Sequence, residues 1–192
     1  AVAVRGSHSV EPTDQHRYYP AHMRLSVIGT GYLGATHAAC MAELGFHVIG
    51  LDVVSEKVEL LNSGEVPFYE PELNEVLRRN IHAGRLTFTT SFAQAAEFAD
   101  IHFICVGTPQ QPGSYAADLS QVFGSVESLA PYLSPTDLVV GKSTVPVGTA
   151  DQIAAMLKIS VPGVEVAWNP EFLREGFAVQ DTLTPDRLVI GV

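Results

Sequence analysis

Cysteine and positive charge are both scarce in this 192-residue sequence, and each shortage excludes a class of protein. The two cysteines, Cys40 and Cys105, lie in apolar segments, so we expect them to pack in the core rather than form a disulfide framework or a cysteine metal site. Lys and Arg number 11 against 21 Asp and Glu, a formal net charge of −10. The sequence has no basic cluster that would attract nucleic acid or an anionic membrane surface, so we predict neither as a partner.

Long apolar runs are also missing. No segment approaches the roughly 20 apolar residues that span a bilayer. Residues 1–22 are polar and aperiodic and lack the apolar centre of a signal peptide, so we interpret them as a disordered extension or an expression tag and predict a cytoplasmic protein. The seven histidines show no ligand spacing, which predicts no metal site.

The stretch that organises the chain is a glycine cluster between a strand pattern and a helix pattern. Residues 25–28 form a short apolar run, and the helix-like segment 35–44 follows the glycines. In a dinucleotide-binding turn, Gly29 would allow the tight turn, Gly31 the approach of a pyrophosphate and Gly34 the packing of helix on strand. The phosphates would then meet free N–H groups at the helix N-terminus. Such a motif is weak when it stands alone.

Asp52 strengthens the interpretation. It ends a second strand pattern, residues 47–52, about 20 residues after the glycines, where the ribose hydroxyls of a dinucleotide lie. A carboxylate accepts hydrogen bonds from a diol and repels a 2′-phosphate, so the cofactor predicted is NAD rather than NADP. The alternative is that Asp52 only caps a solvated turn.

The remaining chain alternates strand and helix patterns. Ser55 is expected to cap a helix to 62, and Pro71 to lie in the first turn of a helix to 81. Further strands are expected at 85–90, 101–106, 138–140, 164–168 and 188–192, with helices at 91–99, at 118–129 and from 148. This alternation predicts one Rossmann-type domain over residues 23–192: an α/β fold with a doubly wound, mostly parallel sheet and helices on both faces.

Several polar residues follow the predicted strands. Thr108, Ser143 and Thr144 could bond a ribose or phosphate, although hydroxyls are common in loops. Glu171 and Glu175 would share one helix face if a helix begins at residues 169–170; acidic residues near a helix N-terminus are also favoured by the helix dipole alone. Spacing therefore indicates an NAD-binding domain and leaves the reaction open.

Five motifs in order resemble the UDP-glucose 6-dehydrogenase family within the UDP-glucose/GDP-mannose dehydrogenases. They are GTGYLG (29–34), YEP (69–71), ICVGTP (104–109), KSTVPVGT (142–149) and NPEFLREG (169–176), followed by PDR (185–187). The resemblance implies that residues 23–192 are the N-terminal NAD-binding domain. It also implies oxidation of the C6 alcohol of a nucleotide sugar to a carboxylate with two NAD, through a thiohemiacetal and a thioester on a cysteine.

The resemblance also implies roles for individual residues. The glycine motif would bind the cofactor through Gly29, Thr30, Gly31, Tyr32, Leu33 and Gly34. Asp52 and Lys57 would hold the adenosine ribose. The rest of the cofactor site would comprise Val106, Gly107, Thr108, Pro109, Ser143 and Glu175. Thr144 and Glu171 would position and activate the water that hydrolyses the thioester, since this intermediate needs a water held by a base. Glu171, Phe172, Leu173 and Glu175 would contact the nucleotide sugar.

The sequence also departs from the family pattern. Leu33 replaces the usual Val, a tolerable change of volume. The Gly-Gly-x-Cys segment that carries the family's catalytic cysteine is not in the sequence, and neither are the dimerising helix and the lysine and asparagine that follow it. We therefore expect an engineered or natural truncation that binds NAD without turnover, and a homo-oligomeric full-length protein. UDP-glucose is the favoured substrate; GDP-mannose, UDP-N-acetyl-mannosamine and a stand-alone nucleotide-binding module are the alternatives.

Overall fold

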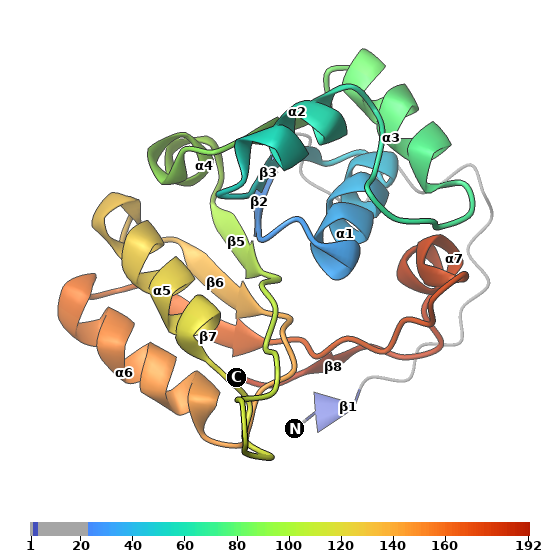
Figure 1. Ribbon diagram of the computed structural model, residues 1–192. Helices are drawn as coiled ribbons and strands as arrows, with labels where there is room; N and C mark the ends of the chain where they lie inside the picture. The colour runs from blue at the N-terminus through green and yellow to red at the C-terminus, as the bar shows by residue number, and fades with distance from the viewer. Residues whose placement is uncertain (1, 4–22) are drawn as a thin grey trace.

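The computed structural model describes residues 2–3 and 23–192, and most of its strands form a parallel sheet covered by helices (Figure 1). The interpretation of residues 1–22 as an extension or tag lies almost wholly outside the described residues. The strands are β1 (Val2–Ala3), β2 (Arg24–Ile28), β3 (His47–Leu51), β4 (Leu86–Thr89), β5 (Ile101–Ile104), β6 (Leu138–Gly141), β7 (Glu165–Trp168) and β8 (Val189–Ile190). The helices are α1 (Tyr32–Glu43), α2 (Ser55–Asn62), α3 (Leu73–His82), α4 (Phe92–Phe98), α5 (Ser120–Leu129), α6 (Thr149–Ser160) and α7 (Ala178–Leu183), with a 3-10 turn at Ala130–Tyr132.

The main sheet has six strands in the order β4-β3-β2-β5-β6-β7, and every neighbouring pair is parallel. The chain runs outward from β2 to β4, then crosses back to place β5 on the other side of β2. The direction of winding therefore reverses between β2 and β5. In open α/β sheets, ligands bind at such a switch point, beyond the carboxyl ends of the strands. β8 pairs with β1 in a two-stranded antiparallel sheet, and Gly191, directly after β8, forms an isolated antiparallel bridge with Trp168 of β7.

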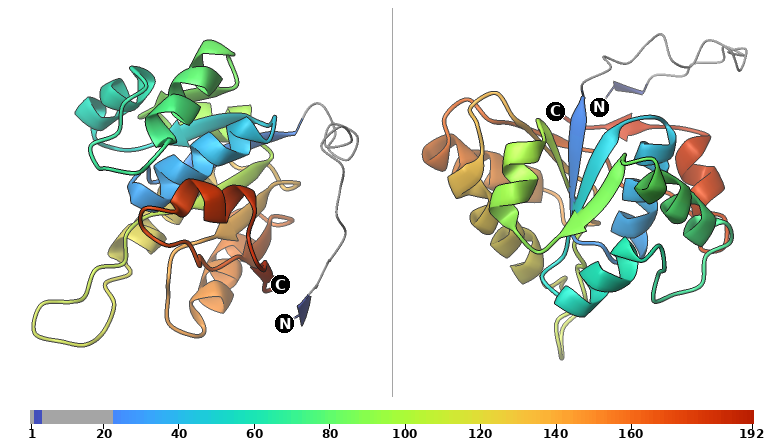
Figure 2. Two further views of the ribbon diagram at one scale, coloured as in Figure 1. Left: turned by 90° about the vertical axis from the view of Figure 1, so that its right-hand side faces the viewer. Right: turned by 90° about the horizontal axis from the view of Figure 1, so that it is seen from above.

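Helices cover both faces of the sheet (Figure 2). Side chains that alternate along the strands divide the core in two. Leu25 and Val27 of β2 pack with α1, α2, α3 and α7 in one cluster, whereas Ile28 packs with α4, α5 and α6 in the other. The doubly wound fold predicted from the sequence is confirmed.

Local helix boundaries were predicted with mixed success. The helix expected at 91–99 is α4, and Ser91 caps it, since its hydroxyl accepts the N–H of Gln94 at 3.2 Å. The predicted cap at Ser55 is wrong: the N-cap residue of α2 is Val54, whose N–H donates to the Asp52 carboxylate at 3.2 Å. Pro71 does not lie in the first turn of α3 either, because Glu72 adopts φ 66° and begins the helix at Leu73.

Among the residues that the structure describes, no helix is both long enough and apolar enough to span a membrane.

Candidate functional site

The glycine turn lies at the switch point of the sheet, between the carboxyl ends of β2 and β5. Gly29 adopts φ +88°, and a Cβ there would lie 2.7 Å from Val106 Cγ1. A Cβ on Gly34 would overlap the carbonyl oxygen of Gly29. Only glycine fits these two positions, because the turn, the helix and the β5 loop are in direct backbone contact. A Cβ on Gly31, in contrast, would meet nothing within 4 Å, so the backbone there is open to a ligand.

A cleft of about 600 Å³ opens beside this turn, and we call it the glycine-turn cleft. Its lining comprises Ile28, Gly29, Gly31, Leu51, Asp52, Val53, Val54, Lys57, Phe92, Cys105, Val106, Gly107, Gln121, Gly124, Ser125 and Ser128. Six of the residues predicted for cofactor binding line it: Gly29, Gly31, Asp52, Lys57, Val106 and Gly107. This cleft therefore lies at the switch point of the strand order, where open α/β sheets bind their ligands.

Asp52 is the charged centre of the cleft. One carboxylate oxygen accepts the N–H and the hydroxyl of Thr30, both at 3.0 Å, and the ammonium group of Lys57 at 2.7 Å. The other oxygen accepts the N–H of Val54. Burial alone would raise the pKa of Asp52, but the hydrogen bonds from Lys57, Thr30 and Val54 outweigh it and hold the pKa below its usual value. The side chain is thus an ionised carboxylate at neutral pH, with its second oxygen able to accept one further donor.

The other residues predicted for the cofactor site mostly hold its framework together. Ser143 donates to the carbonyl of Val106 at 2.7 Å, and Thr108 donates to the carbonyl of Thr144 at 2.8 Å, so the loops after β5 and β6 are joined. Leu33 packs against the core cluster under α1. The remaining predicted positions lie outside the cleft lining: Tyr32 in the first turn of α1, Pro109 in the β5 loop and Glu175, which is exposed, beyond β7.

One face of α5 was missed by the sequence reasoning. Gln121, Gly124, Ser125 and Ser128 line the glycine-turn cleft opposite the glycines. Their spacing of three, one and three residues places them on one side of a helix. This stripe of small and polar residues is the signal that could have found them.

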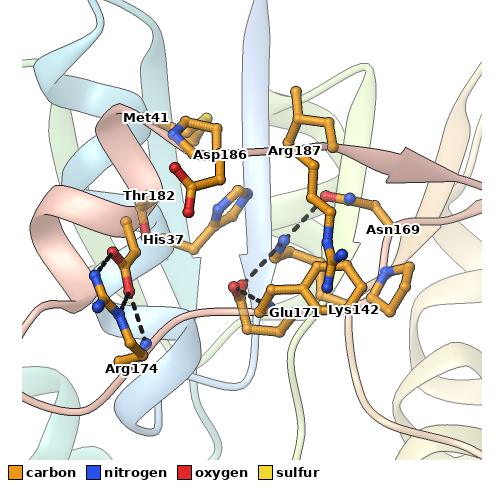
Figure 3. Close-up of a pocket in the computed structure, with 14 residues that line it drawn as sticks. His37, Met41, Lys142, Asn169, Glu171, Arg174, Thr182, Asp186 and Arg187 are labelled. Carbon is orange, nitrogen blue, oxygen red and sulfur yellow. Dashed lines mark hydrogen bonds and ion pairs between the residues drawn. The ribbon is translucent and has the colours of Figure 1, made fainter. Parts of the chain in front are cut away.

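A second pocket, of about 430 Å³, lies between α1, α7 and the segments that follow β6 and β7 (Figure 3). We call it the Glu171 pocket. Its lining comprises His37, Met41, Lys142, Asn169, Pro170, Glu171, Phe172, Arg174, Asp181, Thr182, Pro185, Asp186, Arg187 and Leu188. Of the residues predicted to bind substrate, Glu171 and Phe172 lie here.

Glu171 is held by contacts to both oxygens. One oxygen accepts the N–H groups of Phe172 and Leu173 at 2.7 and 2.8 Å, and the other lies 3.2 Å from Lys142 Nζ. Lys142 is buried and also donates to the Asn169 side chain at 3.0 Å. Because a carboxylate oxygen has two lone pairs, the oxygen facing Lys142 can accept one more donor, such as a water.

The segment 169–176 is not helical, so the condition under which Glu171 and Glu175 would share a helix face is not met. The Glu171 carboxylate bonds to the N–H groups of the next two residues, a local arrangement that competes with helix formation. Helix α7 begins only at Ala178. Phe172 is 49% exposed with the Arg187 guanidinium 4.8 Å from its ring centroid, and Thr144 is also exposed.

His37 of α1 faces the Glu171 pocket with an unusual environment. The side chain is buried, and neither ring nitrogen has a hydrogen-bond partner among the described residues. Its ring and the ring of Phe103 form a T-shaped contact, with their centroids 4.5 Å apart. Burial, with a smaller contribution from the positive charge of Lys142, lowers the pKa of His37 to about 3, so the imidazole is neutral.

The parallel strand order, the glycine turn at its switch point and the acidic residue after the second strand together define a dinucleotide-binding domain of the Rossmann-type dehydrogenases. Comparison with known families identifies the branch. Residues 23–192 match the model of the UDP-glucose/GDP-mannose dehydrogenase family, NAD binding domain, and the chain belongs to that family.

Similar proteins include two that carry the name UDP-glucose 6-dehydrogenase. The protein from Pseudomonas aeruginosa is 47% identical over 176 residues, which are 88% of this chain and 38% of the relative. The protein from Rhizobium meliloti is 41% identical over 172 residues, 88% of this chain and 39% of the relative. The chain thus spans about two fifths of the length of these curated relatives.

Solved structures give the same picture. A UDP-glucose dehydrogenase from Pyrobaculum islandicum superposes with a TM-score of 0.82 at 44% identity, covering 89% of this chain and 41% of that one. A GDP-mannose dehydrogenase from Pseudomonas aeruginosa has a TM-score of 0.84 at 36% identity, covering 88% of this chain and 41% of that one. Because the two scores are so close, the backbone does not distinguish the sugars that these relatives are named for.

Proposed function

We propose that this chain binds NAD in the glycine-turn cleft and serves as the cofactor domain of a UDP-glucose 6-dehydrogenase. The observation that carries the proposal is the position of Asp52. An ionised carboxylate lies at the end of β3 inside the cleft, with the open backbone of Gly31 on the same lining. The ribose of a dinucleotide whose pyrophosphate lies on the N-terminus of α1 would reach this carboxylate.

The charge of Asp52 favours NAD over NADP. A ribose hydroxyl would donate to its second oxygen, whereas a 2′-phosphate would bring at least one more negative charge to a buried carboxylate. Lys57 is already paired with Asp52 at 2.7 Å, so its charge is not free to neutralise a phosphate.

UDP-glucose is the proposed substrate of the longer protein because the curated relatives at 41% and 47% identity are named for it. GDP-mannose and UDP-N-acetyl-mannosamine are the alternatives within the same family. The reaction would convert the C6 alcohol to a carboxylate in two hydride transfers to two NAD, with water as the source of the added oxygen.

Glu171 and Thr144 are proposed to handle that water. The Glu171 carboxylate has one lone pair left after its contacts to Phe172, Leu173 and Lys142, and the residue follows the strand next to the one that Thr144 follows. Phe172, Leu173 and Glu175 are proposed to contact the nucleotide sugar, and Glu175 also the cofactor.

Turnover would require a cysteine nucleophile from outside this chain. Burial raises the pKa of both Cys40 and Cys105 to about 12, so each is a neutral thiol at physiological pH. Neither can act as the thiolate that a thiohemiacetal requires. We therefore expect this chain alone to bind NAD and to form no UDP-glucuronate.

Titration calorimetry of the chain with NAD, NADP and UDP-glucose tests the proposal. NAD should bind more tightly than NADP, and Asp52→Asn should weaken NAD binding by about tenfold, since a charge-assisted hydrogen bond to the ribose is lost. The matched control is Asp151→Asn, which makes the same change on the exposed side of α6 and should leave binding unaltered. Equal affinity for NAD in wild type and Asp52→Asn would refute the role of the carboxylate.

A further inference from the structure

Glu70 of the YEP motif joins three parts of the site that are distant in sequence. Its side chain is 6% exposed and lies in the connection between α2 and α3. One carboxylate oxygen accepts the N–H of Ala178 at 2.9 Å; the other accepts the N–H of Gly176 at 2.8 Å and the hydroxyl of Tyr32. A single buried carboxylate thus holds the glycine turn and the end of the segment 169–176 together.

Tyr32 is well suited to this contact. It is the first residue of α1, directly after Gly31, and its ring packs against Phe68 with centroids 5.0 Å apart. Burial and the hydrogen bond to Glu70 raise its pKa to about 12, so the hydroxyl stays protonated and donates. The same hydroxyl also accepts the N–H of Gly176 at 3.2 Å. The position of Gly176 is therefore fixed directly relative to the start of the helix.

The other ties of this segment differ in strength. At its beginning, Glu171 is anchored by buried Lys142. At its end, the ion pair of Arg174 with Asp181 involves an arginine side chain that is 67% exposed, and such surface pairs contribute little. Charge-assisted hydrogen bonds to a buried carboxylate contribute more. The place of Glu175, next to Gly176, accordingly depends mainly on Glu70.

We propose that Glu70 is a positioning residue for the cofactor, which holds Glu175 and its neighbours against the glycine turn so that the nicotinamide end meets a preformed segment. The inference rests on the proposed function, because it assumes that NAD binds in the glycine-turn cleft. The adenosine end would lie at Asp52 and Lys57, which Glu70 does not contact. Loss of Glu70 should therefore affect one end of the cofactor and spare the other.

The test compares NAD with ADP-ribose, which lacks only the nicotinamide. Glu70→Gln keeps the size of the side chain, but its amide nitrogen cannot accept a hydrogen bond. Either the Ala178 N–H, or the Gly176 N–H and the Tyr32 hydroxyl together, therefore lose this acceptor. We expect NAD binding to weaken about tenfold and ADP-ribose binding to change by less than about twofold in calorimetric titrations of the chain. The control Glu72→Gln makes the same change on an exposed side chain two residues away and should alter neither affinity.

Tyr32→Phe is the second variant, and it carries the test if Glu70→Gln does not fold. It removes one donor and leaves Glu70 with the N–H groups of Gly176 and Ala178, so NAD affinity should fall about threefold with ADP-ribose again spared. Equal weakening of both ligands in these variants would mean that Glu70 only stabilises the fold, and would overturn the inference, as would unchanged NAD affinity. Failure of the wild-type chain to bind either ligand would instead refute the proposed function, and the inference with it.

Discussion

Acid should destabilise this fold through His37 well before its carboxylates protonate. The ring is buried in α1 with no hydrogen-bond partner for either nitrogen among the described residues, and its pKa is lowered from 6.5 to about 3. The unfolded chain therefore binds a proton at this residue where the native chain does not. The contribution of the neutral His37 to stability is fully present above the unfolded pKa of 6.5 and is lost progressively as the pH falls below it.

The size of the effect follows from the two pKa values. At pH 5.5 the protonated form of the His37 imidazole exceeds the neutral form about tenfold in the unfolded chain, whereas the native imidazole stays neutral. This difference favours unfolding by about 1.4 kcal/mol. At pH 7.5 the same difference is about 0.1 kcal/mol. His37→Leu replaces the ring with an apolar side chain that does not titrate, so the loss of stability between these pH values should be about 1.3 kcal/mol smaller in the variant.

Urea unfolding of wild type and His37→Leu at pH 7.5 and pH 5.5 measures this difference in the free energy of unfolding. Both pH values lie above the isoelectric point near 5.0, so association of the uncharged protein does not interfere. His102 is also buried, and burial lowers its pKa despite Asp137 beside it, but its contribution is the same in both proteins and cancels. His82→Gln changes an exposed histidine at the end of α3 and serves as the control. An identical pH dependence in wild type and His37→Leu would refute the reasoning.

Two further predictions concern packing. Gly34→Ala should destabilise the fold by about 3 kcal/mol or prevent folding, because the new Cβ would overlap the carbonyl oxygen of Gly29. Gly124→Ala in α5 should stabilise the fold by about 0.5 kcal/mol, because a Cβ there meets nothing within 4 Å. Thermal unfolding compares the two variants, and equal melting temperatures would contradict the packing argument. Cys40 and Cys105 should not react with a thiol reagent at pH 8 until the chain is unfolded, since burial raises both pKa values to about 12; fast reaction of the native protein would show that a thiol is accessible.

The order of strands and helices was predictable because the signals are local. The apolar runs before Gly29, Asp52 and Gly107 identify three of the strands, and their alternation with helices fixes a doubly wound sheet. The sequence left open whether a helix begins at residues 169–170, and the structure has none there. The Glu171 carboxylate takes the N–H groups of Phe172 and Leu173. Glu70, about a hundred residues earlier, holds the end of this segment through the N–H groups of Gly176 and Ala178, a contact that no local pattern contains.

The candidate site was predictable in the same uneven way. Gly29, Gly31 and Asp52 line the cleft as predicted, because the motif that identifies them depends on short spacings along the chain. The wall formed by α5 and the contact between Ser143 and Val106 depend on which strands become neighbours, and this follows only from the complete sheet. Glu70 was part of a motif without a role until the structure placed it beside Tyr32.

The hydrogen bonds of Asp52 bear on the redesign of cofactor preference. The obvious change toward a phosphorylated ribose is to replace this carboxylate with a small or basic residue. Here that change would also remove the acceptor for the backbone N–H of Thr30, which is buried at the glycine turn, and would leave Lys57 without its partner. The proposed preference for NAD and the shape of the turn depend on the same carboxylate, so a variant that accepts the larger cofactor would need another acceptor for the Thr30 N–H.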